Sequence, residues 1–315
     1  MERGTEMTIF HLCSLLGGLG LFLYGMWMMR EHLQAAAAHQ IERFLKRLTA
    51  TRMRGFLVGI GVTAVLQSSS AVMVLLVGLT DAGLIGLTQA VWVILGANIG
   101  TTVTGQLIAL RVEGFAPLLA FVGILLLLFA RQERWRRWGG LLAGVGVMFI
   151  GLTMMGEAML PLKGEAWFLS LLASCRHPAA GIFAGTAVTA ILQSSSASIA
   201  MLQTLAKSGL VDLSQSIYLV FGQNMGTCVT GLLASAGGGR NGRQTAVIHL
   251  LVNVFGTILF LCLVQLFPIG SWVEGLAPGS VAKQIADLHT IFNLVTSLTL
   301  LPLSGLLVRV AKWQF

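Results

Sequence analysis

Apolar runs separated by short polar or basic links make up most of this 315-residue chain. A helix needs about 20 apolar residues to cross a bilayer. The runs therefore predict membrane crossings at 8–29, 84–110, 116–130, 139–156, 210–235, 244–267 and 283–310. The mixed stretch from Glu31 to Leu48 instead predicts a helix lying along the interface. The pattern as a whole predicts an all-α membrane protein.

Two further apolar runs, 55–80 and 179–207, carry a polar block near the middle, and the two blocks are copies of each other. The sequence TAVLQSSSA starting at Thr63 returns as TAILQSSSA starting at Thr189, at an offset of 126 (189 − 63 = 126). Four adjacent side chains that each need a hydrogen-bond partner are costly away from water. They are therefore the strongest candidates for ligand-binding groups in the chain.

A second duplicated block follows each of these runs at the same offset. Gly96–Gly105 reads GANIGTTVTG, and Gly222–Gly231 reads GQNMGTCVTG. Three glycines with Asn and Thr can unwind a helix and expose carbonyls and hydroxyls, so we expect broken spans within 84–110 and 210–235. Small residues at close helix–helix contacts are the alternative. The duplicated Asn and Thr favour the broken helices, because packing alone does not need them.

The duplication divides the chain into a first repeat at 1–130, a second repeat at 131–267, and a C-terminal membrane helix with a short tail at 268–315. The composition agrees with this organisation, since 56% of the residues are hydrophobic and 10% are charged, against about 25% charged in soluble domains. The net charge of +8 lies mainly in short links. Such links are typical of cytoplasmic loops and not of a nucleic-acid surface.

The orientation follows from the three densest basic segments, 43–54, 131–137 and 240–243. All three can face the cytoplasm only if 55–80 and 179–207 turn back as re-entrant hairpins. Three crossings then separate the hairpins, so the two repeats have opposite orientations and the C-terminus is cytoplasmic. Inverted repeats with polar hairpin tips and broken helices are typical of secondary transporters.

The four polar blocks contain no Asp, Glu, Lys or Arg, and the nearest charges, Asp81 and Lys207, lie at equivalent hairpin ends (207 − 81 = 126). Hydroxyls, amides and helix N-termini hold an anion through O–H and N–H donors. Neighbouring oxygens hold sodium, whose charge offsets that of the anion in a low dielectric. The residues alone therefore predict a sodium-driven oxyanion symporter.

The two Gln-Ser-Ser-Ser blocks, each followed by Gly-x-Asn-[Ile/Met]-Gly-Thr, resemble the type II sodium/phosphate cotransporter family. The resemblance implies inverted repeats and secondary-active transport of inorganic phosphate, with Na⁺ as the coupling ion and no cofactor. By position it assigns phosphate binding to Gln67, Ser68, Ser69, Ser70, Gln193, Ser194, Ser195 and Ser196. The sodium or companion positions are Asn98, Thr101, Thr102, Asn224 and Thr227.

The family also suggests an inner (plasma) membrane location and a homodimer. Two departures stand out: Cys228 replaces the hydroxyl found at Thr102, and the chain ends near its last span, without the C-terminal regulatory domain of many bacterial relatives. A sodium-independent phosphate exporter and a carrier of another oxyanion stay open as alternatives.

Two further patterns place His and Asn one turn apart on a helix, His249 with Asn253 and His289 with Asn293. We favour a helix–helix hydrogen bond over gating or proton sensing for both, because their separation (289 − 249 = 40) does not match the repeat. ATP-binding loops, zinc-protease motifs and nucleophile elbows are absent from the sequence. The chain is therefore not expected to be an enzyme.

Overall fold

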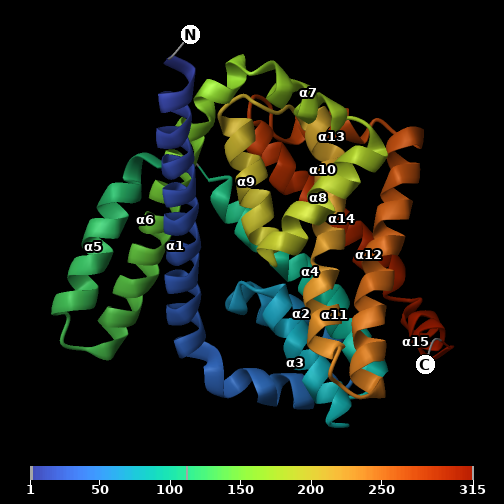
Figure 1. Ribbon diagram of the computed structural model, residues 1–315. Coiled ribbons are helices and arrows are strands. Elements are labelled where there is room, and N and C mark those ends of the chain that lie inside the picture. The colour runs from blue at the N-terminus through green and yellow to red at the C-terminus, as the bar shows by residue number, and fades with distance from the viewer. Residues whose placement is uncertain (1–2, 111–112, 314–315) are drawn as a thin grey trace.

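The computed structural model describes residues 3–110 and 113–313, apart from the side chains of 3–8 and 35–48. The regular elements within these ranges are all helices (Figure 1). They are α1 (Arg3–Leu48), α2 (Arg52–Leu66), α3 (Ser69–Asp81), α4 (Leu87–Ile108), η1 (Glu113–Phe115), α5 (Ala116–Phe129), α6 (Glu133–Met159), η2 (Leu160–Gly164), α7 (Ala166–Ser174), α8 (Pro178–Leu192), α9 (Ser195–Lys207), α10 (Leu213–Gly226), α11 (Cys228–Ser235), α12 (Arg240–Leu266), α13 (Ile269–Leu276), α14 (Val281–Leu300) and α15 (Ser304–Trp313).

Three helices, α1, α5 and α6, form a group of their own, on the left in Figure 1. α6 lies between the other two and meets both through glycines. A Cβ added at Gly144 would lie 2.5 Å from the backbone nitrogen of Met29 in α1, and one added at Gly146 would lie 2.3 Å from that of Ala120 in α5. The absence of a side chain at these positions lets the backbones approach closely.

In each repeat, the helix before the Gln-Ser-Ser-Ser block packs on the helix that begins the following span, α2 on α4 and α8 on α10. Glycines at equivalent positions make both contacts. A Cβ at Gly96 would lie 2.0 Å from the carbonyl oxygen of Phe56, and one at Gly222 would lie 2.1 Å from that of Ile182. The partners are also equivalent (182 − 56 = 126). The repeat in the sequence is therefore a repeat in the packing.

The second helix of each pair also contacts helices outside its own repeat. α3 packs against α11 and α12 as well as α4, and α9 packs against α4 and α14 as well as α6, α8 and α10. In Figure 1, α2 and α3 lie in the lower half, α8 and α9 in the upper half, and α12 runs past both. Phe221, Phe260 and Phe292, from α10, α12 and α14, pack together in the core, with ring centroids 5.2 Å apart for Phe221–Phe292 and 4.9 Å for Phe260–Phe292.

The helices confirm a multi-pass membrane protein. Within the described residues, five segments are long and apolar enough to cross a bilayer: Ile9–Gln34, Leu87–Ile108, Glu133–Gly164, Leu213–Ser235 and Arg240–Leu266. They coincide with the crossings expected near 8–29, 84–110, 139–156, 210–235 and 244–267.

Two of the expected crossings differ in the structure. The run 116–130 forms α5, whose 14 residues reach about 21 Å, short of a hydrocarbon core of about 30 Å. The expected single helix at 283–310 is wrong, because α14 and α15 meet at an angle of 82°. Pro302 lies at the bend, where its missing N–H and its ring end a helix.

The helix breaks predicted within 84–110 and 210–235 are only partly found in the structure. α4 is one continuous helix of 22 residues through Gly96–Gly105, so the expectation of a break within 84–110 is wrong. The hydroxyls of Thr101 and Thr102 bond back to carbonyls of the same helix, at 3.1 Å to Ala97 and 2.8 Å to Ile99. The glycines serve the contact with α2 instead. In the second repeat only Thr227 interrupts the run, between α10 and α11.

The far end of each second helix is tied to the other repeat by a charge. The Asp81 carboxylate accepts hydrogen bonds from the backbone N–H groups of Gly242, at 2.9 Å, and Gly239, at the start of α12. Lys207 donates to the carbonyl of Ile108 at the end of α4, at 3.0 Å, and pairs with Glu113. Opposite charges thus stabilise opposite helix ends, as helix dipoles favour.

Candidate functional site

The two Gln-Ser-Ser-Ser blocks form turns of the same geometry between two helices. Gln67 and Gln193 both adopt the left-handed conformation, with φ of 51° and ψ of 27° and 25°. Ser68 and Ser194 then cap the following helices, each accepting a hydrogen bond at 3.2 Å from the N–H three residues on. A side-chain oxygen at this position begins a helix by satisfying a free N–H. The repeated sequence therefore specifies a repeated turn, which we call the first tip (67–70) and the second tip (193–196).

The two tips touch. The Ser70 hydroxyl donates to the carbonyl oxygen of Gln193 at 3.2 Å, although 123 residues separate them. Thr230 on α11 lies beside this contact, with its hydroxyl oxygen 3.4 Å from that of Ser70. The N-termini of α3 and α9, which begin at Ser69 and Ser195, therefore lie together. Helix N-termini favour anions through their free N–H groups and their dipoles.

Most of the predicted site residues are withdrawn from the surface. The buried ones are Gln67, Ser69, Ser195, Ser196, Asn98, Thr101, Thr102, Asn224 and Thr227. Ser68, Ser70 and Ser194 are partly exposed, and Gln193 is exposed. No carboxylate or basic side chain lies within the tips, so hydroxyl, amide and backbone groups provide the polarity there.

The predicted companions lie on α4, α10 and the break after it, and most of their donors bond within their own helix. Asn224 donates to the carbonyl of Val220 at 2.9 Å, and Thr227 donates to that of Gln223 at 3.1 Å. The amide oxygen of Asn224 accepts from Asn293 of α14, at 3.2 Å. The lone pairs of the Thr hydroxyls stay available as oxygen ligands, because each hydroxyl donates once and can still accept or coordinate.

Several buried polar atoms around the tips have no hydrogen-bond partner. They include the hydroxyls of Thr63 and Thr189, which are equivalent residues, and that of Ser198, together with the amide oxygen of Gln223, whose amide nitrogen donates to the carbonyl of Ser198. Buried polar groups in folded proteins are nearly always paired with protein or water. This concentration of unpaired oxygens is what a site for water and ions requires.

The two histidines occupy matching places that the sequence offset does not reveal. A Cβ added at Gly105 would lie 3.9 Å from Nδ1 of His289, and one added at Gly231 would lie 3.6 Å from Nδ1 of His249. These glycines are equivalent (231 − 105 = 126). Asn253 and Asn293 each donate at 2.9 Å to the carbonyl of the histidine one turn earlier. α12 and α14 therefore play matching roles without being copies.

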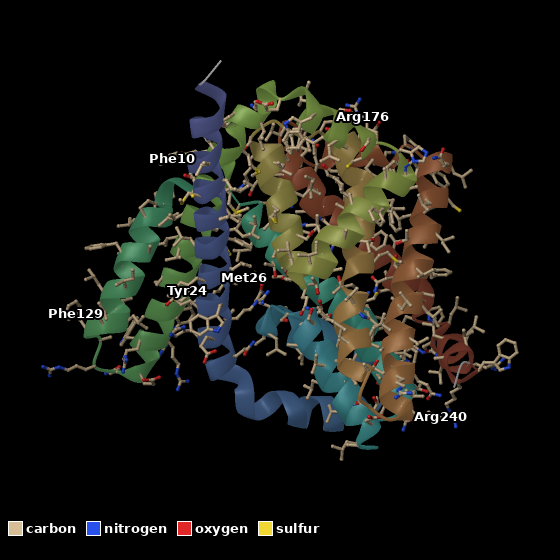
Figure 2. All side chains as sticks on the ribbon, viewed as in Figure 1. Phe10, Tyr24, Met26, Phe129, Arg176 and Arg240 are labelled. Carbon is tan, nitrogen blue, oxygen red and sulfur yellow. The ribbon has the colours of Figure 1, made fainter. Side chains whose placement is uncertain are left out.

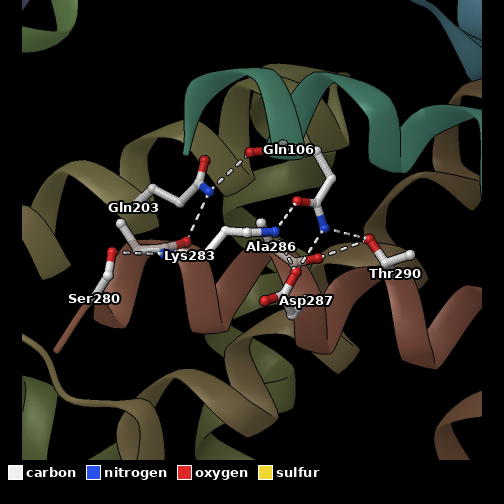
Figure 3. Close-up of polar contacts among 9 residues, drawn as sticks. Gln106, Gln203, Ser280, Lys283, Ala286, Asp287 and Thr290 are labelled. Carbon is white, nitrogen blue, oxygen red and sulfur yellow. Dashed lines mark hydrogen bonds and ion pairs between the residues drawn. The ribbon is translucent and has the colours of Figure 1, made fainter. Parts of the chain in front are cut away.

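A charged cluster joins the end of α4 to α14, and sequence analysis missed it (Figure 3). Lys283 donates to the Asp287 carboxylate at 2.6 Å and to the Gln106 side-chain oxygen at 2.5 Å. Gln106 donates in turn to Asp287 and Thr290, at 3.0 and 2.9 Å. The sequence signal that could have revealed the cluster is the pair of opposite charges at Lys283 and Asp287, which lie one turn apart on α14. The cluster anchors the α4 block immediately after Gly105.

Cys228, which replaces the hydroxyl found at Thr102, lies on the second half of the interrupted span. Its thiol is buried and lies 3.7 Å from the carbonyl oxygen of His249. A thiol is a weak donor and a poor ligand for hard cations. The two repeats are therefore chemically unequal at this position, as the sequence predicts. Among the described residues no group of three or more His, Cys, Asp or Glu side chains is placed to hold a metal ion.

Comparison with known proteins gives one family. The family model described as "Na+/Pi-cotransporter" matches residues 21–157 and again residues 153–277. The double match follows the internal duplication. No solved structure matches the chain.

Two of three curated relatives match almost the whole chain, and the third matches about a third of it. "Uncharacterized protein YqeW" of Bacillus subtilis is 34% identical over 291 residues, which are 91% of this chain and 93% of that protein. "Putative inorganic phosphate export protein YjbB" of Salmonella typhimurium is 26% identical over 97% of this chain, which spans 55% of the YjbB length. "Sodium-dependent phosphate transport protein 2A" of Oryctolagus cuniculus is 32% identical over 114 residues, 36% of this chain and 18% of that protein. On these matches, this chain belongs to the Na+/Pi-cotransporter family, a family of transporters and not of enzymes.

Proposed function

We propose that this protein is a secondary-active, sodium-coupled transporter of inorganic phosphate. The observation that carries the proposal is the contact between the tips, where Ser70 of one repeat meets Gln193 of the other. The N-termini of α3 and α9 meet there, each beginning within its own run of serines. That arrangement suits an oxyanion, which accepts hydrogen bonds through several oxygens at once.

Phosphate would be bound by Gln67, Ser68, Ser69 and Ser70 from one side and by Gln193, Ser194, Ser195 and Ser196 from the other. Hydroxyl and N–H donors can hold the anion without a basic side chain. Release then needs no strong ion pair to break, which suits a carrier.

Sodium would bind close to the anion, on oxygens of Asn98, Thr101, Thr102, Asn224 and Thr227. A cation within a few ångströms offsets the cost of bringing phosphate into a low-dielectric site. The rabbit relative, named as a sodium-dependent phosphate transporter, supports this part of the proposal.

Transport would proceed by alternating access between two repeats of opposite orientation in the inner membrane, with the C-terminus in the cytoplasm. This orientation counts the short helix α5 as a crossing, which local thinning of the bilayer allows. The placement of α2 and α3 in one half of the molecule and of α8 and α9 in the other supports this arrangement (Figure 1). The tips would then end re-entrant hairpins at the midplane. Irregular backbone is tolerated at that depth only when protein or a water-filled cavity surrounds it.

A sodium-independent phosphate exporter is the second candidate. The observation that favours it is the YjbB match, because a protein named as a putative phosphate exporter aligns with 97% of this chain. Carriage of another oxyanion would use the same donors.

The test is uptake of labelled phosphate into proteoliposomes that hold the purified protein, with and without an inward sodium gradient. Saturable, sodium-dependent uptake that arsenate competes away is expected. Saturable flux that ignores sodium would replace the proposal with the exporter. Absence of phosphate flux, with flux of sulfate or another oxyanion, would replace the substrate.

The assignment of the tips has its own test. Ser69→Ala and Ser195→Ala each remove one buried hydroxyl from a tip, so both should lower phosphate transport about tenfold or more. Ser14→Ala, on α1 and away from the tips, is the matched control and should leave transport near the wild-type rate. Equal, small effects at all three positions would contradict the assignment.

A further inference from the structure

The last threonine of each duplicated block has a different partner in the two repeats. Thr104 and Thr230 are equivalent, as are Gln67 and Gln193 (230 − 104 = 126; 193 − 67 = 126). In the first repeat the Thr104 hydroxyl donates to the side-chain oxygen of Gln67 at 2.6 Å, and both residues are buried. The first tip is therefore held by its own repeat.

In the second repeat the matching hydrogen bond is not made. Thr230 bonds back to the carbonyl of Thr227, at 2.8 Å, and lies 3.4 Å from the Ser70 hydroxyl of the opposite tip. The Gln193 side chain is exposed and forms no hydrogen bond with the residues that the structure describes. The second tip is held instead through its carbonyl, which accepts from Ser70.

The use of the Thr104 hydroxyl is specific. The hydroxyls of Thr101 and Thr102, on the same helix, donate hydrogen bonds to backbone carbonyls three or four residues earlier. Threonines in apolar helices commonly do this. Thr104 instead donates across to Gln67. A hydroxyl rotates freely and can exchange partners without a change of charge, which suits a low-dielectric site.

We propose that Thr104 and Thr230 are positioning residues that hold the two tips in turn during transport. In the second state Thr230 donates to the Gln193 side chain, Ser196 donates to the carbonyl of Gln67, and Thr104 lies beside Ser196. Since every group has its counterpart 126 residues away, the exchanged state contains the same set of hydrogen bonds. This inference rests on the proposed function, because it takes the repeats as inverted and alternating.

The exchange accounts for two states that are close in free energy. Leaving a buried donor or acceptor without a partner destabilises a state strongly. If one tip simply released its glutamine, the buried oxygen of Gln67 would lose its donor. When the Thr104–Gln67 hydrogen bond breaks and the Thr230–Gln193 hydrogen bond forms in the same step, the number of buried hydrogen bonds is conserved. Small ligand-binding energies can then shift the population.

The experiment compares Thr104→Val, Thr230→Val and the double variant in right-side-out and inside-out vesicles. Valine keeps the shape and removes the hydroxyl. Thr104→Val weakens the state described here and Thr230→Val weakens its counterpart. The ratio of the KM values for phosphate at the two faces should therefore move in opposite directions, by about fivefold each. The double variant should return the ratio close to the wild-type value, and Thr104→Ser and Thr230→Ser, which keep the hydroxyl, should not move it.

If both valine variants moved the KM ratio in the same direction, and the double variant moved it further, the hydroxyls would only support the fold. That result would overturn the proposal. An unchanged ratio in all variants would overturn it too.

A second readout does not depend on phosphate flux. Val65→Cys and Ile191→Cys stand at equivalent positions just before the tips, and Ile191 is 80% exposed against 37% for Val65. In a background without Cys13, Cys175, Cys228 and Cys262, labelling by a water-soluble maleimide should shift from position 191 towards 65 in Thr104→Val and away from 65 in Thr230→Val. Wild-type protein without phosphate flux would sink the proposed function, whereas absence of these opposite shifts would sink only the exchange.

Discussion

The first and second tips share a sequence, a turn and a helix cap, yet their surroundings differ. Gln67 is buried, and its side chain accepts from Thr104 and donates to the carbonyl of Ala64. Gln193 has the same backbone conformation and is exposed. The two copies of the motif therefore share a backbone conformation and a helix cap, whereas the neighbouring helices decide how exposed each copy is.

One difference between the surroundings of the two tips lies in α1. Gln34 donates to the carbonyl of Leu66, just before the first tip, at 3.4 Å. The equivalent residue is Leu160 (160 − 34 = 126), which has no side-chain donor. Figure 2 labels Tyr24 and Met26 on α1, which runs past both the upper and the lower half of the molecule. An internal duplication can thus diverge at its periphery while the candidate binding residues stay matched.

The largest predicted effect concerns a feature that the repeats share. Gly96→Ala and Gly222→Ala would each place a Cβ against a backbone carbonyl oxygen, at 2.0 Å from Phe56 and 2.1 Å from Ile182. Backbone cannot yield as a side chain does, so we expect a loss of about 3 kcal/mol or more, with little folded protein in detergent. Gly61→Ala, which meets nothing within 4 Å, is the control. A monodisperse, thermally stable Gly96→Ala protein would contradict the close packing.

The next prediction separates the two glutamines. Gln67→Ala removes the acceptor of the Thr104 hydroxyl and leaves a buried donor unpaired, so we expect the protein to be destabilised by about 2 kcal/mol. Gln193→Ala removes an exposed side chain and should change stability by about 0.5 kcal/mol or less. Thermal unfolding of both variants in the same detergent is the measurement. Equal shifts in Tm would mean that the two tips are equally buried in solution.

The contrast between the tips also shows how far the sequence could predict the site. The offset of 126 was enough to find both tips and the candidate binding residues, because helix packing alone seldom requires a duplicated polar block in an apolar run. The break expected within Gly96–Gly105 was wrong for a physical reason. Glycines four residues apart, such as Gly96 and Gly100, can either unwind a helix or let another helix approach, and the same residues serve both purposes. Only the carbonyls of α2 facing them decide between the two.

The pairing of the histidines could not be predicted from the offset. His249 and His289 lie beside equivalent glycines, but their helices are not copies of each other in the chain. Spatial symmetry here comes from how α12 and α14 pack against the repeats. The bend near Pro302, by contrast, had a local signal, since a proline within an apolar run ends or kinks a helix.

A smaller effect is expected from Gln34→Leu, which gives the first tip the residue that the second repeat has at Leu160. The lost hydrogen bond is long, at 3.4 Å, so the destabilisation should be about 0.5–1 kcal/mol. Labelling of Val65→Cys by a water-soluble maleimide should nevertheless rise towards the rate of Ile191→Cys. Gln132→Leu, outside both tips, is the matched control. An unchanged labelling rate in Gln34→Leu would show that Gln34 does not set the difference between the tips.

The smallest effect concerns the far ends of α3 and α9, where the repeats differ in charge. Hydrogen bonds from the backbone N–H groups of Gly242 and Gly239 lower the pKa of the Asp81 carboxyl. A carboxyl whose pKa is lower in the folded state adds stability above its unfolded value, near about 4, and that stability is lost as the pH falls through the folded pKa. We therefore expect the Tm of the wild-type protein to fall by a few degrees more between about pH 5 and pH 3 than that of Asp81→Asn. Glu274→Gln removes an exposed carboxylate that forms no hydrogen bond or ion pair with the described residues, so it should keep the wild-type loss in acid. If Asp81→Asn lost as much Tm as the wild type over this range, the carboxylate would not be what ties α3 to α12.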